Sequence, residues 1–323
     1  HTAIRYENPS QGIDAVFNYG LFSFNTPNFI FRFSLGETDY QLGVTDYEHF
    51  AAEYAFYGRS VWQQTLNLTD EEKTKLIQLL QENYHPENRV YRYNFFYDNC
   101  ATRPRDKIEE SIAGKVIYPA EPQDGSLTFR DIVHQYCKGH PWARFGIDLC
   151  IGSEADQPIT QRQMMFAPFY LMDAFDGAQI KGDSIQRPLI TANELIVDAT
   201  PEPDESDWMP TPLQCSLLLF ILTAAATIYG IRRRTGLWGI DLFLFGIAGI
   251  VGCVLAFLAL FSQHPAVSSN FLLLVFHPGQ LLFLPYIIYC VRKGKKCWYL
   301  TLNLAVLTLF IVLFPVIPQR FDF

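Results

Sequence analysis

The sequence predicts an α+β domain followed by a bundle of four transmembrane helices. Three observations predict this fold class. Apolar residues make up 49% of the 323-residue chain, but they are concentrated after about residue 212. The earlier part mixes strand-like and helix-like segments and has the composition of a globular domain. An acidic, proline-containing linker at 198–212 separates the two parts. We therefore expect a folded domain at 1–197 and membrane helices at 213–318.

The chain opens with a predicted β-hairpin. Residues 1–6 form the first strand, 7–12 form a turn rich in Asn, Pro and Gly, and the return strand begins at 13–17. Folding about this turn brings Asn18 or Tyr19 opposite His1, so a polar partner would lie beside a histidine. A frayed terminus with no role for His1 is the simpler interpretation. Because the chain begins with His rather than Met, we expect that a preceding segment, such as a signal peptide, was removed or left out.

Besides a helix-like segment over 106–112, two helices are predicted in the first domain. Thr69 and Glu72 form a capping box that opens a helix ending near Tyr84. A second short helix is predicted over 126–136. The apolar face of the first helix indicates a role in supporting the fold.

The stretch from Tyr91 to Asp106 contains the strongest chemical signal. Asp98 and Asn99 form a helix-capping pair, Cys100 follows at once, and cationic Arg103 and Arg105 come next. The positive end of a helix and nearby arginines both favour a thiolate, which is the nucleophilic form of cysteine. The alternative is a small buried core residue. Pro104 indicates either that a new helix begins there or that the helix bends.

Several classes of site are excluded or disfavoured by composition. The net charge of −8 provides no basic surface for nucleic acid. The seven cysteines lack CxxC spacing, so no metal site is expected and no cofactor is predicted. If the first domain faces an oxidising compartment, Cys137 and Cys150 form the natural disulfide and leave Cys100 free.

A methionine-rich and aromatic run follows, and it has two interpretations. Such side chains adapt to flexible apolar ligands and could line an acyl-chain groove, but they suit an ordinary core equally well. The groove candidates in this run are Met164, Met165, Phe166, Phe169 and Met172.

Four apolar segments are long enough to span a bilayer, at 213–231, 237–261, 271–291 and 298–317. The connections 232–234 and 292–296 are basic, whereas 262–270 holds no Lys or Arg. The positive-inside rule then places the first domain, the 262–270 loop and the C-terminus outside, which in a bacterium is the periplasm. His277 would lie about 10 Å below the outer edge of the third span. Polar groups at that depth are often functional, although a bond within the bundle is the simpler role.

A cysteine nucleophile needs a base within hydrogen-bond reach. The expected outer domain offers five histidines, and spacing alone does not choose among them: His1, His49, His85, His134 and His140.

A family resemblance narrows the choice. The residues His-Thr-Ala-Ile-Arg at 1–5, Phe-Asn-Tyr-Gly at 17–20 and Asn-Cys-Ala-Thr-Arg at 99–103 resemble the permuted papain-like (NlpC/P60-related) fold. With four C-terminal spans, nearly the whole chain resembles the bacterial lipoprotein N-acyltransferases of the Lnb type. The resemblance implies a Cys100 nucleophile with His1 as base, oriented by Asn18 or, second in preference, Tyr19.

The same resemblance implies two-step acyl transfer in the bacterial inner membrane. A phospholipid would donate an acyl chain to Cys100 as a thioester, and the α-amino group of a diacylglyceryl-cysteine lipoprotein would accept it. The backbone N–H of Cys100 is a natural oxyanion donor, with Tyr93 or Asn94 as a candidate second donor. Asn99 is a further support candidate. Arg103 would pair with Asp106 or meet a lipid phosphate.

Two alternatives use the same residues differently. A membrane-tethered papain-like peptidase or amidase acting on cell wall would use Cys100 and His1 in an open polar groove. A non-enzymatic membrane receptor would keep the fold without the chemistry.

Overall fold

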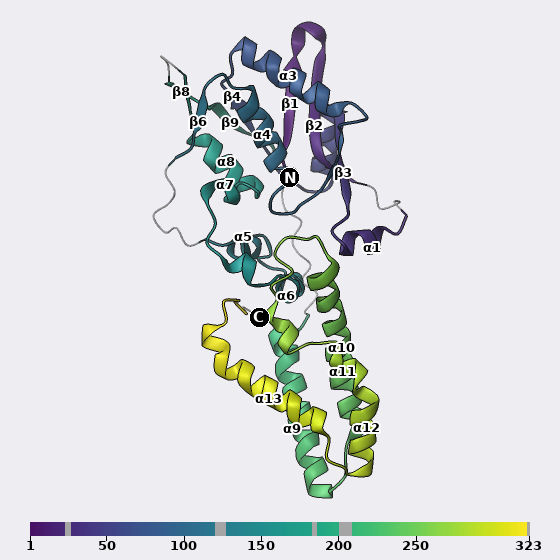
Figure 1. The fold of residues 1–323 in the computed structure, drawn as a ribbon. Coiled ribbons are helices and arrows are strands. Elements are labelled where there is room, and N and C mark those ends of the chain that lie inside the picture. Colours follow the sequence, from purple (N-terminus) through teal and green to yellow (C-terminus); the bar gives the residue numbers. More distant parts are fainter. Residues whose placement is uncertain (23–26, 120–126, 183–185, 200–208, 322–323) are drawn as a thin grey trace. The chain divides into compact units, whose positions relative to one another are not determined.

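A computed structural model describes residues 1–22, 27–119, 127–182, 186–199 and 209–321 (Figure 1). Contacts divide the chain into two compact units. The N-terminal unit comprises 1–127 and 158–206, and the membrane unit comprises 128–157 and 207–323. The predicted first domain at 1–197 included residues 128–157. In the structure these residues pack with the membrane helices and belong to the membrane unit. The predicted linker falls largely on 200–208, which lies outside the described residues.

The N-terminal unit contains a four-stranded antiparallel sheet in the order β1-β2-β3-β5. Its strands are β1 (Ala3–Asn8), β2 (Ile13–Leu21), β3 (Asp39–Asp46) and β5 (Val90–Arg92). The predicted hairpin is confirmed, and β2 extends through residues 18–20. Its turn is a short 3-10 helix (η1, Pro9–Gln11) closed by Gly12, whose φ of 65° favours glycine.

Among its described residues, this unit also contains two smaller sheets and six α-helices. Strand β4 (Val61–Leu66) pairs with β9 (Ile190–Val197), and β7 (Gln179–Lys181) lies between β6 (Lys115–Ile117) and β8 (Gln186–Pro188). The helices are α1 (Phe29–Ser34), α2 (Tyr47–Phe56), α3 (Asp70–Tyr84), α4 (Thr102–Ser111), α7 (Gln161–Met164) and α8 (Pro168–Asp176). One apolar core joins the first sheet to α3, α4 and α8, and Tyr19, Leu80 and Leu189 are fully buried in it.

Helix α3 begins where the sequence predicts. Glu72 N–H donates to Thr69 Oγ1 at 3.3 Å, and Thr69 N–H donates back to Glu72 Oε2 at 2.8 Å. Glu72 is 4% exposed and also accepts from the Ala113 N–H at 3.1 Å and from Arg187. These bonds hold α3 against the segment that follows α4.

The membrane unit begins with α5 (Phe129–Tyr136), α6 (Pro141–Cys150) and the 3-10 helix η2 (Ser153–Asp156). Thr128 caps α5, so the predicted helix is confirmed from there, whereas Ser126 lies outside the described residues. Arg130 is fully buried and pairs with Asp148 and Asp156, both at 2.7 Å. Cys137 and Cys150 are free thiols, so the predicted disulfide is not formed.

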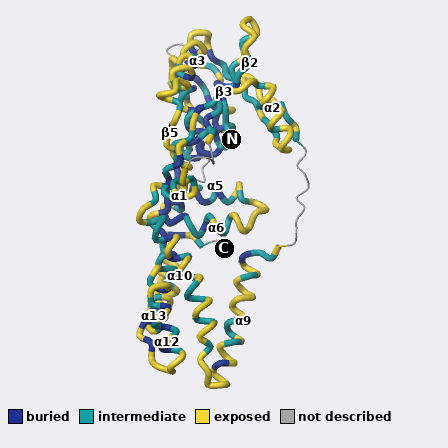
Figure 2. The backbone as a smooth tube through the Cα atoms, turned by 90° about the vertical axis from the view of Figure 1, so that its right-hand side faces the viewer, coloured by how far each residue is buried: buried dark blue, intermediate teal, exposed yellow. Residues whose placement is uncertain are grey.

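Three described helices are long and apolar enough to span a membrane, and a bent pair would make a fourth. The long helices are α9 (Pro212–Arg233), α10 (Trp238–Phe261) and α13 (Trp298–Leu313), which continues as the 3-10 helix η4 (Phe314–Val316). Figure 2 shows exposed residues along them, as expected for lipid-facing sides. The third predicted span, 271–291, is broken in the structure: 271–282 and 284–293 meet at 71°.

The break has a local cause. The first arm contains the 3-10 helix η3 (Phe271–Leu274) and α11 (Gly279–Leu282), with Pro278 between them. The second arm is α12 (Leu284–Lys293), and Pro285 is its second residue, next to the bend. A proline cannot donate the backbone bond that a continuous helix needs. Gly252 of α10 lies against the backbone of His277, where a Cβ would be 2.5 Å from the His277 nitrogen. The missing side chain lets the irregular segment approach α10.

Within the membrane unit, the two basic connections between helices lie near each other, and the 262–270 loop contacts a different part of the unit. Gly236, beside the basic 232–234 turn, lies against Val291, which precedes the basic 292–296 turn. The 262–270 loop instead meets residues 149–153 through a 2.7 Å bond from Asn270 Nδ2 to the Leu149 carbonyl. Gln319 Nε2 donates to Asn270 Oδ1 at 3.2 Å. The C-terminal tail therefore lies beside the uncharged loop.

Candidate active site

The Cys100 turn is built by the preceding asparagine. Asn99 Oδ1 accepts from the N–H groups of Ala101 at 2.8 Å and Thr102 at 3.0 Å, so it satisfies amides that a helix start leaves unpaired. Helix α4 begins at Thr102, so Cys100 lies in the turn just before the helix rather than in its first turn. Pro104 is the third helical residue, where a missing N–H costs nothing. The presence of Pro104 allowed either a bent helix or a new helix that begins near it, and the structure shows the helix start.

The amide of Asn99 is fully used in this support. Its Nδ2 donates to the Phe95 carbonyl at 2.8 Å and to the Phe166 carbonyl at 2.9 Å. The residue is 3% exposed. Asn99 therefore stabilises the turn from its buried side. Both N–H groups of its side-chain amide are already used, so neither is available to a substrate.

Arg103 forms an ion pair, but with Asp98 rather than with the predicted Asp106. Its Nε lies 2.6 Å from Asp98 Oδ1 and its Nη2 lies 2.8 Å from Asp98 Oδ2. The guanidinium carbon also lies 3.6 Å from the ring centroid of Tyr91. Asp106 pairs instead with Arg105 and Arg162. Arg103 thus closes the Cys100 turn across its two ends.

His1 lies beside Cys100, and Asn18 orients it. His1 Nε2 lies 2.7 Å from Asn18 Oδ1, and the pKa of Cys100 reflects a hydrogen bond between the thiol and His1. The hairpin register, in which Ala3 faces Asn18, places His1 over Gly20. A Cβ on Gly20 would lie 2.3 Å from His1 Cε1. The absence of a side chain on Gly20 therefore leaves the space that the Cε1 edge of the imidazole occupies.

The hydrogen bonds fix the roles of the two ring nitrogens. Asn18 Oδ1 also accepts from the Gly20 N–H at 2.8 Å, which identifies this atom of the amide as the oxygen. An oxygen that only accepts requires a proton on His1 Nε2. Nδ1 is then the nitrogen free to exchange a proton with the Cys100 thiol.

The pKa values of the pair move toward each other. Burial alone would lower the pKa of His1, but hydrogen bonding and attraction to Cys100 raise it above its ordinary value, and Asn18 adds to this. Burial alone would raise the pKa of Cys100, but His1 lowers it, helped by the backbone N–H groups of Thr2 and Cys100 itself. Both shifts favour a thiolate–imidazolium pair, the reactive form of a cysteine nucleophile.

Aromatic side chains form the surroundings of the thiol. Tyr40 and Tyr93 stack with ring centroids 4.1 Å apart. Burial raises the pKa of each phenol, and the charge of Cys100 raises it further. Both therefore stay neutral hydroxyls near the sulfur, and Tyr93 keeps its predicted place as a candidate donor.

Two other candidates serve the fold instead. Tyr19 is fully buried and its Oη donates to Asn83 at 2.9 Å, so Asn18 and not Tyr19 meets His1. Asn94 Oδ1 accepts from the N–H groups of Phe96 and Tyr97, both at 3.2 Å, in the turn before Cys100. Side-chain alternation along β2 turns neighbouring residues to opposite faces, which separates Asn18 from Tyr19.

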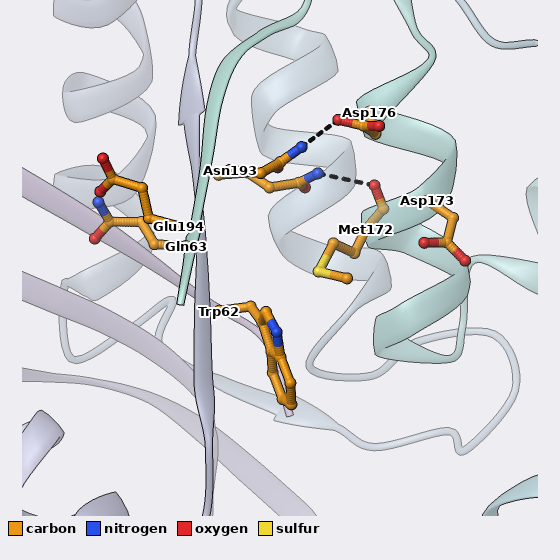
Figure 3. Close-up of a pocket in the computed structure, with 8 residues that line it drawn as sticks. Trp62, Gln63, Met172, Asp173, Asp176, Asn193 and Glu194 are labelled. Atoms are coloured by element: carbon orange, nitrogen blue, oxygen red, sulfur yellow. Dashed lines mark hydrogen bonds between the residues drawn. The ribbon is translucent and has the colours of Figure 1, made fainter. Parts of the chain in front are cut away.

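Some residues of the methionine-rich run are buried in the core, and others lie at the surface. Met164, Met165 and Phe166 are at most 6% exposed, which favours the core interpretation for these three. Phe169 is 44% exposed and packs edge-on against Trp62 at 5.2 Å. Met172 lines a pocket of about 160 Å³ between β4, α8 and β9 (Figure 3). The residues that line this pocket include none of Cys100, His1 and Asn18.

His277 lies in the membrane unit, at the break of the third apolar segment. Its ring packs against Tyr299 with centroids 6.3 Å apart, and Gly279 gives it room. This ring contact lies within the membrane unit and favours the simpler role for His277, an interaction inside the bundle.

The remaining histidines of the predicted outer domain have other surroundings. His134 bonds to Asp148 at 2.8 Å and His49 lies 3.6 Å from Asp46. His85 and His140 stand at the ends of helices.

Comparison with known protein families gives a match for each of the two parts of the chain. Residues 1–134 match the Lnb N-terminal periplasmic domain, and residues 204–323 match the Lnb transmembrane domain. The chain belongs to the Lnb family. Searches of curated proteins and of solved structures give no match.

The Lnb match gives the candidate site a compartment. Cys100, His1 and Asn18 all lie within the part matched to the Lnb periplasmic domain, and a transmembrane domain follows in the same chain. The fold class predicted from the sequence, an α+β domain before a helical membrane part, is confirmed.

Two contributors to the site were not expected from the sequence of this Lnb family member. Gly20 was visible only as part of a motif, and its role appears once the hairpin register places it under His1. The Thr2 amide points its N–H at the Cys100 sulfur, and a backbone group leaves no trace in side-chain patterns.

Proposed function

We propose that this protein is a cysteine-dependent lipoprotein N-acyltransferase of the bacterial inner membrane. The observation that supports it best is the Cys100–His1–Asn18 arrangement in a periplasmic domain attached to membrane helices. The aromatic surroundings of Cys100 suit an acyl chain, whereas a peptidase acting on cell wall would require an open polar groove.

The first half-reaction forms a thioester. The Cys100 thiolate attacks the ester carbonyl carbon of a membrane phospholipid, and a C–S bond forms. The C–O bond of the ester then breaks, and the His1 imidazolium gives its Nδ1 proton to the leaving alkoxide. The products are S-acyl Cys100, neutral His1 and a lysophospholipid.

The second half-reaction restores the resting pair. The neutral α-amino group of a diacylglyceryl-cysteine lipoprotein attacks the thioester, and a C–N bond forms as the C–S bond breaks. His1 Nδ1 takes the proton that the nitrogen loses, and the thiolate leaves. Cys100 and His1 return to the thiolate–imidazolium state, so the cycle consumes no cofactor.

The negative oxygen of each tetrahedral intermediate needs fixed donors. The N–H of Cys100 lies at the start of the α4 turn, and the Thr2 N–H points at the same sulfur. The Tyr93 hydroxyl, kept neutral by burial, is the third candidate. Backbone donors require no reorganisation because the hairpin and the Asn99-capped turn hold them.

The test is a transfer assay with the full-length protein in phospholipid vesicles and a synthetic diacylglyceryl-cysteine peptide. The proposal expects N-acylated peptide and lysophospholipid in equal amounts, and loss of both with Cys100→Ala. A peptidase would instead cleave cell-wall peptides and leave the lipopeptide unchanged. Absence of both reactions in protein with an intact Cys100–His1 pair would favour the receptor alternative.

A further inference from the structure

An exposed apolar surface lies on α1 of the N-terminal unit. Ile30 is 80% exposed, Phe31 is 58% exposed and Phe33 is 49% exposed. The single charge of this helix, on Arg32, is paired with Asp39 at 2.7 Å. Neighbouring large apolar side chains on a short helix are costly in water and mark a binding surface.

A continuous series of ring contacts leads from this helix toward the nucleophile. Phe33 stacks on Phe29, Phe29 stacks on Phe22, and each pair of centroids is 6.0 Å apart. Phe22 then contacts Tyr40 at 4.9 Å. Tyr40 stacks on Tyr93, and both phenols respond to the charge of Cys100. We call these five rings, Phe33, Phe29, Phe22, Tyr40 and Tyr93, the aromatic track.

We propose that α1 inserts its exposed apolar residues into the outer leaflet of the membrane and that the aromatic track guides a phospholipid acyl chain to Cys100. The inference deepens the proposed function, on which the acyl chemistry at Cys100 rests. The membrane is the occupant because the same chain carries a transmembrane domain that keeps the periplasmic unit at the bilayer.

The character of the surface indicates how it would bind. Arg32 and Arg92 share Asp39, and Glu37 lies in the same loop, so the formal charge around α1 is balanced. Insertion would then depend on apolar burial, with little contribution from attraction to anionic headgroups. Aromatic rings also suit the interface between headgroups and acyl chains.

The first test maps lipid contacts on the unmodified full-length protein. It is reconstituted in vesicles of phosphatidylethanolamine and phosphatidylglycerol that contain a phosphatidylcholine with a diazirine on one acyl chain. After photolysis, peptides covering 29–34 are expected to carry lipid adducts, and high salt should not reduce them. Peptides around Phe56, which is 82% exposed outside the track, provide the comparison. Absence of adducts on α1 would overturn the insertion.

The second test compares acyl donors. For each variant, the rate of Cys100 acylation by long-chain phospholipid in vesicles is divided by the rate with short-chain dihexanoyl phosphatidylcholine. The double variant Ile30→Ser/Phe31→Ser is expected to lower this ratio about tenfold, and Phe56→Ser is expected to leave it unchanged. An unchanged ratio in the double variant would contradict a role of the exposed α1 residues in delivering long-chain phospholipid to Cys100.

The two outcomes separate the inference from the proposed function. If the unmodified protein is not acylated by either donor, the proposed function fails, while the adduct map still tests insertion. If acylation is normal and α1 shows no adducts, the function stands and the inference fails.

Discussion

One oxygen of Asn18 accepts hydrogen bonds from both His1 Nε2, at 2.7 Å, and the Gly20 N–H, at 2.8 Å. Through this shared acceptor, the His1 imidazole is linked to the backbone of the hairpin that carries it. The imidazole is therefore held by a hydrogen bond at Nε2, and its Cε1 edge lies close to Gly20. The hairpin therefore carries the candidate base, the residue that orients it and the glycine that leaves space for it.

Removing the Asn18 amide should weaken catalysis without unfolding the protein. Asn18→Ala leaves His1 Nε2 without its acceptor, and loss of such an orienting bond lowers activity by about 10- to 100-fold. Asn18→Asp keeps an acceptor and should retain more activity than the alanine variant. The measurement is the rate of lipopeptide N-acylation at matched protein amounts. Equal activity of Asn18→Ala and the unmodified protein would remove Asn18 from the site.

Adding one methyl group at Gly20 should displace the base. The new Cβ would lie 2.3 Å from His1 Cε1, so the ring must move, and a shift of that size costs about 100-fold in rate. Gly146→Ala is the matched control, because a Cβ there meets nothing within 4 Å. We expect Gly20→Ala to lose acyl transfer and to keep its melting temperature. If Gly20→Ala transfers acyl chains at the normal rate, the ring does not rest on this glycine.

The pH dependence of thiol alkylation should report the ion pair. The pKa of Cys100 lies below its ordinary value of 9.0 and that of His1 lies above 6.5. The thiolate should therefore persist as pH falls below 9 and be lost only as pH passes the lowered pKa of Cys100. His1→Ala removes the imidazolium, so its alkylation profile should shift to higher pH. Iodoacetamide labelling of Cys100, followed by peptide mass analysis across pH, measures both profiles; superimposed profiles would exclude the pair.

Arg130 should be essential for the stability of the membrane unit. It is fully buried between two carboxylates. Removing it leaves the buried Asp156 side chain without its ion-pair partner and leaves Asp148 with only His134 and the more distant Arg144. Arg130→Met should therefore cost about 3–5 kcal/mol of unfolding free energy. Arg144→Met is the control: its side chain is 40% exposed and lies 3.8 Å from Asp148, so it should cost about 1 kcal/mol or less. Denaturation in detergent compares the two, and equal losses would contradict this account.

The C-terminus should be periplasmic. Gln319 bonds to Asn270 and to the Ile151 carbonyl, both at 3.2 Å, so the tail lies at the same end as the uncharged loop. For this to hold with both basic turns in the cytoplasm, the bent pair must cross the membrane. Alkaline phosphatase fused after Phe323 should be active, and the same enzyme fused after Arg234 should be inactive. An inactive C-terminal fusion would indicate that the bent pair turns back.

Local signals predicted much of the fold. Thr69 and Glu72 marked the start of α3 because a capping box depends only on neighbouring residues. The turn at Gly12 located the hairpin, and unbroken apolar runs located α9 and α10. Pro278 and Pro285 were visible in the sequence, but the close packing of Leu281 and His277 against Gly249 and Gly252 of α10 joins distant parts of the chain, which no local pattern reveals.

Sequence patterns identified the candidate residues whose chemical type carries the signal. They missed the residues whose role depends on how the hairpin and the Cys100 turn fold. Cys100 stood out by its cap and its arginines, whereas His1 was selected only by family resemblance. Arg103 has two carboxylates within a few residues, and the fold of the turn favours Asp98. Met164–Phe166 had the composition of a groove, but the Asn99 bond to Phe166 shows that this segment supports the nucleophile turn from inside.

The central claim is that Cys100 carries the acyl chain between donor and acceptor. Intact mass measurement of the full-length protein after incubation with phospholipid, with the lipopeptide left out, tests it most directly. We expect a mass increase of one acyl chain that maps to Cys100 and is absent in Cys100→Ala. Neutral hydroxylamine should remove it, and it should disappear when lipopeptide is added. N-acylated lipopeptide formed without any acyl adduct on Cys100, or formed equally by Cys100→Ala, would contradict it.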